Sequence, residues 1–235
     1  MEQLWSGLVE AISLIAHRDG ELWDVTSRTI VVSGAATLLA MVVGVPVGYI
    51  LARGHFRGRT LVLGLVNTGM GMPPVVVGLF VWLMLVRSGP FGSFELIYTK
   101  RAMVIAQFLI AAPMVVGFTS AAVQSLPEDL PDLLTVLGAG RLRTLWLLSR
   151  EAHLGLLSAI MAGFGAVVSE VGASMTVGGN LQHSTRVLTT DIVTETGRGN
   201  IDRAIALGII LLAMTFLVNL LLTAVQQRTV RRRGG

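Results

Sequence analysis

Chemistry that depends on ionisable side chains has few candidate residues in this chain. The 235 residues include 4 histidines and no cysteine, so thiolate ligands and cysteine nucleophiles are unavailable. No two histidines have the H-E-x-x-H spacing of a zinc protease. The only lysine, Lys100, follows a threonine, so the phosphate-binding pattern G-x-x-x-x-G-K-[ST] does not occur. We therefore expect no enzyme active site, metal site or ATP site in this chain.

Glu170 is the single carboxylate that falls inside a long apolar run. A charged group in a bilayer costs roughly 2.5 to 3.5 kcal/mol on insertion scales, so it is retained for a reason. Counting from residue 154 at about 1.5 Å per residue places Glu170 about 25 Å along a helix, near its end. We therefore expect a hydrogen-bonded carboxylate at a helix end rather than a proton relay.

Residues 125–150 have the pattern of two short helices separated by glycines. Ser125 and Glu128 match a capping box, which predicts a helix start, and leucines follow at i, i+3, i+4 and i+7. Gly138 and Gly140 interrupt this stripe before a second helix that carries three arginines. Such an element either lies flat on a membrane or inserts an apolar ridge into another protein. The acidic residues at its start favour the second alternative, because an anionic membrane surface repels them.

The composition indicates that membrane helices hold Glu170 and the 125–150 element in place. The chain is 53% hydrophobic and 14% charged, whereas soluble domains carry about 25% charged residues. Its apolar runs reach the roughly 20 residues that cross a hydrocarbon core. The basic residues lie at the ends of these runs, as topology determinants do, so we do not expect a nucleic-acid partner. The predicted fold class is an all-α polytopic membrane protein in contact with membrane lipid.

Five membrane-spanning helices are predicted, and a shorter N-terminal helix over residues 3–16 is expected to lie at the membrane interface. Pro73 and Pro74 lack amide donors, so the second span must kink or break there. An odd number of spans places the termini on opposite sides. The arginines that follow the first and fifth spans favour an external N-terminus and a cytoplasmic C-terminus in the cell membrane. The expected spans are 30–52, 61–86, 102–123, 154–172 and 204–225.

Several segments resemble one family. One of them is the motif E-A-A-x3-G-x9-I-x-L-P, whose glycine aligns with Gly138. In that alignment Asp132-Leu133-Leu134 takes the place of E-A-A, and Leu148 to Glu151 takes the place of I-x-L-P. That motif is the cytoplasmic EAA loop of permease subunits of binding-protein-dependent ABC importers. NTGMGMPPVVVGL, RSGPFGSFELIYTKRAMVIAQ and SEVGASMTVGGNLQHSTRVLTTDIVTETGRGN are similar to the tungstate type, within a branch that also includes molybdate and sulfate permeases.

The resemblance implies a type I ABC importer transmembrane domain with five core helices, which forms the pore as a homodimer. It implies two copies of an ABC ATPase, which bind ATP and Mg, and an external oxyanion-binding protein. No cofactor and no enzyme activity are then expected in this chain. The residues expected in the ATPase-docking loop are Asp132, Leu134, Leu137, Gly138 and Arg141.

An oxyanion needs hydrogen-bond donors along its path, and neutral hydroxyls hold it weakly enough for release. The segment around residues 173–202 offers such donors. The predicted path residues are Ser174, Thr176, Thr185, Arg186 and Thr189.

The predicted function is tungstate import by alternating access, with Pro73 and Pro74 as a hinge. A molybdate or sulfate permease of the same type stays open, as do a secondary carrier or channel that works without ATP and a membrane scaffold protein. The expected divisions are residues 1–28 as the N-terminal helix and external segment, 29–226 as the permease domain with the coupling loop 124–152, and 227–235 as a basic tail.

Overall fold

The structure is a computed structural model that describes residues 2–17 and 19–231. In these residues the chain forms eleven α-helices and one 3-10 helix and no strand, which confirms the all-α prediction. The elements are α1 (Glu2–Ala16), α2 (Gly20–Arg53), α3 (Arg59–Met70), α4 (Pro74–Leu85), η1 (Gly92–Phe94), α5 (Lys100–Gln124), α6 (Leu130–Val136), α7 (Arg141–Glu151), α8 (His153–Val168), α9 (Gly172–Gly178), α10 (Leu188–Gly197) and α11 (Ile201–Arg231).

Three single helices are long and apolar enough to cross a membrane: α2, α5 and α11. The helix α2 has 34 residues and begins at Gly20, well before residue 30, where a span was expected. The Asp19 side chain caps it by accepting a hydrogen bond of 2.8 Å from the Leu22 amide. Asp24 and Arg28 form an ion pair of 2.7 Å one turn apart, so the charges that end the apolar run do not end the helix.

The second expected span is a bent pair of helices, and the helix of the fourth expected span, α8, is bent against α7 of the expected coupling loop. α3 and α4 meet at 104° and α7 and α8 at 78°. Pro73 is the N-cap of α4 and Pro74 its first residue, so the break lies where the two prolines predict it. The expected span 154–172 also stops early, because α8 ends at Val168 and α9 begins at Gly172.

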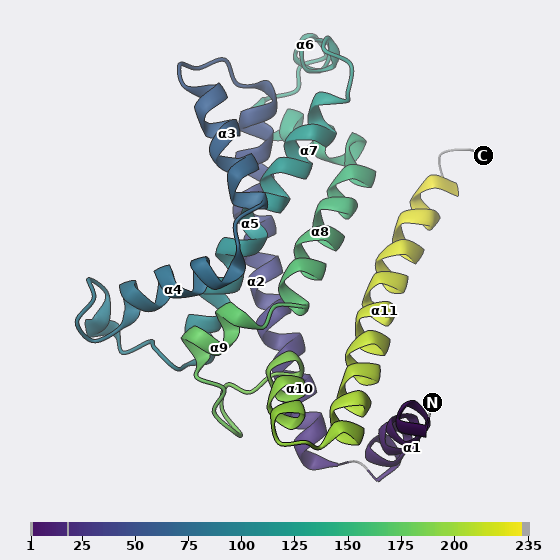
Figure 1. Ribbon diagram of the computed structural model, residues 1–235. Coiled ribbons are helices and arrows are strands. Elements are labelled where there is room, and N and C mark those ends of the chain that lie inside the picture. Colours follow the sequence, from purple (N-terminus) through teal and green to yellow (C-terminus); the bar gives the residue numbers. More distant parts are fainter. Residues whose placement is uncertain (1, 18, 232–235) are drawn as a thin grey trace.

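The helix α5 lies at the centre of the bundle, packed against α2, α8 and α9 (Figure 1). Glycines allow α2 to approach it closely: a Cβ added at Gly44 would lie 2.9 Å from Val115, and one added at Gly48 would lie 2.7 Å from Thr119. Small residues permit such approaches between membrane helices, where dispersion contacts replace the hydrophobic effect.

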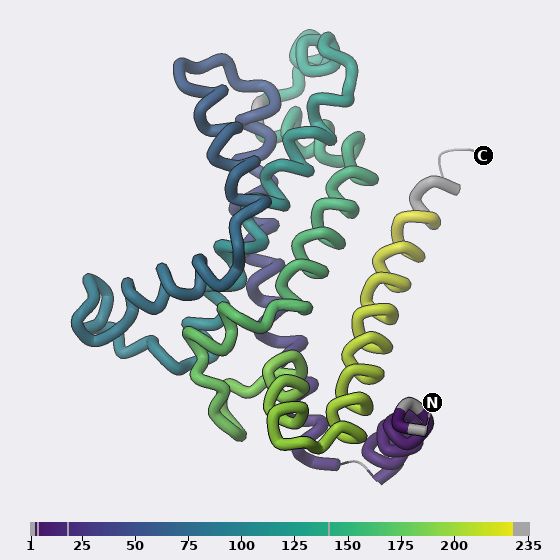
Figure 2. The backbone as a smooth tube through the Cα atoms, in the orientation of Figure 1, coloured from purple at the N-terminus to yellow at the C-terminus, as the bar shows by residue number. Residues whose placement is uncertain are grey.

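The bundle has two ends, which we name by their helices. The α6 end carries α6 and α7, and the α10 end carries α10 and α1, while α4 projects sideways between them (Figure 1). The tube in Figure 2 shows α1 beside the first turns of α11. There Ala11 and Leu14 of α1 are buried with Leu207 and Ile210 of α11. The expected N-terminal helix therefore forms and is attached to α11.

Candidate functional site

The expected docking loop forms a helix–turn–helix at the tip of the α6 end. Gly138 ends the first helix with φ of +82°, a conformation that disfavours residues with a Cβ. The apolar side chains around this turn point away from the bundle: Val136 is 86% exposed, Leu137 74% and Leu142 84%. Large apolar side chains exposed together mark an interaction surface. We call these three residues and Leu133, which is also exposed, the apolar tip.

The other docking residues occupy the same element. Asp132 is exposed on α6, and Leu134 is half-buried. The side chain of Arg141, at the first position of α7, lies outside the part of the chain that the structure describes, as do residues 232–235 of the basic tail.

The predicted capping box at Ser125 is wrong. α5 continues to Gln124, so Ser125 is its C-cap, and the Ser125 hydroxyl donates to the Ala122 carbonyl at 2.8 Å. The helix that follows begins only at Leu130, after Asp129, which makes no side-chain capping bond. The match to S-x-x-E therefore fell at a helix end rather than at a helix start.

Arg53, the last residue of α2, holds the base of the docking loop. Its Nη2 donates to the carbonyls of Val123, Leu126 and Pro127 at 3.1 to 3.2 Å, which joins the end of α2 to the end of α5 and the residues that follow it. A polar cavity of about 790 Å³ lies beside this contact, between the α2–α3 loop and α6, and Asp132 is part of its wall. The docking loop is thus attached to both α2 and α5 at its base.

Glu170 lies at the break between α8 and α9, as the sequence predicts for a carboxylate at a helix end. It is buried, and its Oε1 accepts a hydrogen bond of 2.7 Å from the Ala173 amide. One turn on, the Gln107 side chain of α5 donates to the Ser174 hydroxyl at 3.2 Å. Gln107 is 2% exposed and sequence reasoning missed it, although a glutamine inside an apolar span is the kind of signal that could have found it.

The predicted path residues lie on α9 and on the segment that follows it, and most of their polar atoms already have partners. Thr176 donates to the Gly172 carbonyl and Thr189 to the Glu170 carbonyl. Thr185 donates to the Gly178 carbonyl and accepts from the Leu181 amide. These hydroxyls fix the fold of residues 170–191 in this conformation, and their role in a solute path stays a prediction.

Arg186 belongs to a group of ion pairs at the α10 end. The buried guanidinium lies 3.5 Å from Asp191 and 3.8 Å from Glu21, and Arg203 of α11 pairs with Glu21 at 3.0 Å. Burial raises the pKa of the Asp191 carboxyl even though Arg186 acts to lower it. These pairs join the start of α2 to α10 and α11. Across the described residues, no group of three or more histidine and acidic side chains is arranged to hold a metal.

Comparison with known proteins identifies the family. Residues 44–233 match the family model described as "Binding-protein-dependent transport system inner membrane component". A probable anion ABC transporter permease protein of Haloferax volcanii is 42% identical over 91% of this chain and 94% of its own length. A tungstate uptake system permease protein of Peptoclostridium acidaminophilum is 34% identical over 97% of this chain and 100% of its own length.

The fold has solved counterparts. One is the MetNI methionine ABC transporter, whose chain aligns with a TM-score of 0.68 at 16% identity, over 88% of this chain and 94% of that one. The likeness supports the type I importer architecture inferred from the sequence. This chain is therefore a member of the family of inner-membrane components of binding-protein-dependent transport systems, the permeases of ABC importers.

Proposed function

We propose that this chain imports tungstate as the permease subunit of an ATP-driven transporter. The name of the Peptoclostridium relative gives tungstate, and that of the Haloferax relative gives an anion. The hydroxyl-rich segment 169–200, which resembles the tungstate type, supports the same solute class. Molybdate and sulfate are tetrahedral dianions too, so they are the alternatives within the same mechanism.

The apolar tip is the observation that carries the mechanism. Its large apolar side chains are mostly exposed to solvent. Apolar surfaces of this kind mark sites that another protein covers. We infer that an ABC ATPase subunit covers the tip and that ATP and Mg bind to that subunit. Asp132 and Leu134 on α6, with Gly138 in the turn, form the rest of the docking surface, and Arg141 begins the second helix.

The attachment of the tip gives its movement a route into the bundle. Arg53 bonds the base of the docking loop to α2 and α5, and α7 continues into α8 through a bend of 78°. When the ATPase subunits close, α6 and α7 move and carry these helices with them. The break at Pro73 and Pro74 serves as a hinge, and two copies of the chain enclose the path.

The path residues are proposed at the α8–α9 break and the segment after it. Ser174 and Thr176 on α9 follow Glu170, and Thr185, Arg186 and Thr189 lie in the segment that leads to α10. The present contacts of the three threonines to backbone carbonyls would exchange for contacts to the solute in another conformation. The α6 end then faces the cytoplasm and the α10 end faces outward, toward the oxyanion-binding protein.

Reconstitution tests this function directly. The purified chain is placed in liposomes with its ATPase subunit and binding protein, and ATP turnover is measured with tungstate, molybdate or sulfate. We expect tungstate to stimulate turnover and to accumulate inside, with molybdate and sulfate weaker. Equal stimulation by all three anions would contradict the tungstate assignment.

The same liposomes distinguish an importer from a secondary carrier. With the ATPase omitted we expect no anion uptake, because nothing then drives the docking loop. Uptake without the ATPase would contradict the importer mechanism, and absence of flux under every condition would favour a scaffold protein.

A further inference from the structure

An apolar groove lies at the side of the bundle, away from the docking loop, and none of the proposed path residues lines it. It has a volume of about 330 Å³, and every residue that lines it is apolar. Phe80 and Met84 come from α4, Phe91 and Phe94 from the loop after it, and Ile105 and Leu109 from α5. Its volume falls at the lower end of the range for small-molecule sites, about 300 to 1,000 Å³.

The groove has rigid walls. The Phe91 amide donates to the Met84 carbonyl at 2.9 Å, which folds the loop back onto α4. The rings of Phe91 and Phe94 lie 6.4 Å apart. At the far end of the loop, the Tyr98 amide donates to the Val177 carbonyl at 2.9 Å. A groove held in this way loses little conformational freedom when a ligand enters it.

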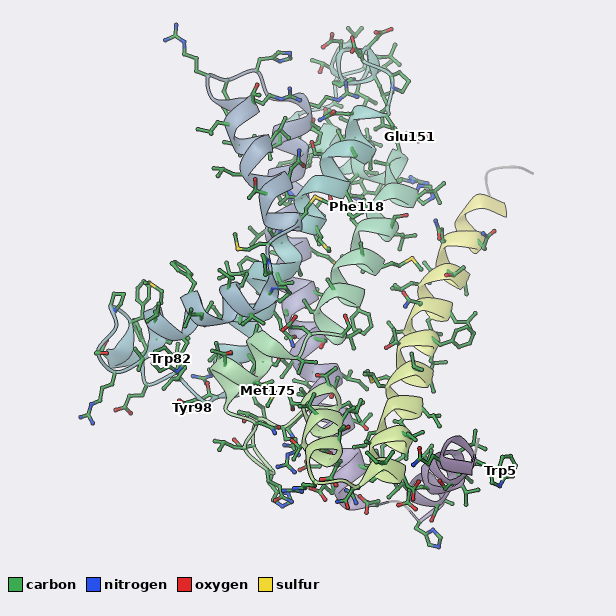
Figure 3. All side chains as sticks on the ribbon, viewed as in Figure 1. Trp5, Trp82, Tyr98, Phe118, Glu151 and Met175 are labelled. Carbon is green, nitrogen blue, oxygen red and sulfur yellow. The ribbon has the colours of Figure 1, made fainter. Side chains whose placement is uncertain are left out.

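The level of the groove in the membrane follows from its neighbours. α5 is long and apolar enough to cross a membrane, and its only charged residues are the first two, Lys100 and Arg101, so the hydrocarbon core begins just after them. Trp82 and Tyr98 lie side by side beside the groove, with Nε1 of the tryptophan 3.5 Å from the tyrosine hydroxyl (Figure 3). Such residues concentrate at the boundary between the hydrocarbon core and the headgroups. The groove therefore opens into the lipid leaflet at the α10 end.

Three basic residues lie within a few positions of residues that line the groove. Arg101 precedes Ile105 and Leu109 on one face of α5, at four-residue spacing. Lys100 and Arg87 are also exposed, and within the described residues none of these three cations has an ion pair or a side-chain hydrogen bond. Glu95 is the one acidic residue between Arg87 and Arg101, so the loop keeps a net positive charge.

We propose that this groove binds one acyl chain of an anionic phospholipid, whose headgroup phosphate is held by Arg87, Lys100 and Arg101. The apolar lining matches a hydrocarbon chain, and basic clusters at the membrane surface bind anionic headgroups. A zwitterionic lipid fills the groove less well because it brings no net negative charge. This site does not depend on which solute the permease carries.

The test uses the fact that the chain has no cysteine. A single cysteine introduced as Phe94→Cys carries a bimane fluorophore, and a matched Leu212→Cys variant carries the same probe on α11. The two side chains are 67% and 71% exposed, respectively. The full-length protein is placed in phosphatidylcholine vesicles, and quenching is measured as brominated phosphatidylglycerol or brominated phosphatidylcholine replaces part of the lipid.

We expect brominated phosphatidylglycerol to quench the probe at position 94 at several-fold lower mole fractions than brominated phosphatidylcholine, with no such preference at position 212. Adding Arg87→Gln, Lys100→Gln and Arg101→Gln together should remove this several-fold preference, because the headgroup charge then has no basic partner. Equal quenching by the two lipids at position 94 would overturn the proposal. So would efficient linkage of two Phe94→Cys chains by a bismaleimide, because a second copy of the chain would then cover the groove.

Discussion

The two ends of the bundle differ in how far their side chains are satisfied by contacts within the chain. At the α10 end, charged groups find partners within the chain: Arg203 with Glu21 at 3.0 Å, and buried Arg186 between Glu21 and Asp191. At the α6 end, large apolar side chains such as Leu137 stand in the open.

This difference indicates which end of the bundle exposes a surface for a partner protein. A buried charge is tolerated only when it is paired, and at the α10 end the buried Arg186 and Asp191 pair with each other. The apolar tip gains nothing from exposure and is stabilised only by a surface that covers it. Substitutions at the α10 end should therefore lower the free energy of unfolding, whereas those at the α6 end should lower the affinity for the ATPase subunit.

The largest expected effect is that of Arg186→Met. It leaves the buried Asp191 carboxylate without its nearest cation, and breaking a buried pair from one side costs about 3 kcal/mol or more. Thermal unfolding in detergent should show this loss. The control is Arg57→Met, an exposed arginine with no ion pair in the described part of the chain, which should unfold like the parent. An equal loss in both variants would show that the α10 end does not depend on its ion pairs.

The next effect comes from Glu195→Gln and depends on pH. Burial acts to raise the pKa of Glu195, but hydrogen bonds from Asn200 and Arg198 hold it below its ordinary value of 4.5. A carboxyl with a lowered pKa contributes stability above the unfolded value and loses it as pH falls through the folded value. The variant should therefore be about 1 to 2 kcal/mol less stable at pH 7.

The parent and the Glu195→Gln variant should converge in stability below about pH 4.5, where the native carboxylate takes up a proton. Unfolding curves of both proteins between pH 7 and pH 3 measure this convergence. A difference that stays constant over the whole range would mean that the carboxylate charge has no part in the contact.

Hydropathy alone located the main helices, because an apolar run of the right length has few alternatives to a membrane span. Their ends were harder to place. α2 begins at Gly20, where Asp19 caps it, and Asp24 and Arg28 pair within its first turns. A count of charges treats these two residues as unfavourable for a membrane helix, because it does not see their pairing. The proline pair predicted the break before α4, but the angle of 104° depends on how α4 packs against α5 and α9.

The sequence predicted those features of the candidate site that depend on neighbouring residues, but not those that depend on contacts between residues far apart in the chain. Gly138 stands out in the sequence, and its left-handed backbone gives the reason. By contrast, Thr185 and Thr189 looked like free donors, since nothing in the sequence shows that their hydroxyls reach the carbonyls of Gly178 and Glu170. The Arg53 contact that holds the base of the docking loop joins residues 70 or more positions apart, beyond the reach of any local pattern.

At the α6 end, Gly138→Ala tests whether ATPase binding needs the left-handed backbone of the turn, and Gly140→Ala is its control. The Gly138 φ of +82° costs a residue with a Cβ about 1 kcal/mol. Gly140→Ala lies two residues away at φ of −70°, and an added Cβ there meets nothing within 4 Å. We expect Gly138→Ala to weaken ATPase binding roughly fivefold, and Gly140→Ala to leave it unchanged. Equal behaviour of the two variants would contradict a requirement for the left-handed turn.

The smallest expected effect on unfolding is that of Leu137→Ala, and it separates the two ends most sharply. The side chain is 74% exposed, so its loss should change stability by no more than about 0.5 kcal/mol. If an ATPase subunit covers it, the same change should weaken that complex by about 1 kcal/mol or more, measured as the affinity of the ATPase for the permease in nanodiscs. Leu212→Ala, at 71% exposure on α11, should alter neither quantity. A Leu137→Ala protein that binds the ATPase normally would mean that the tip is covered by something else, and the membrane surface would then become its better partner.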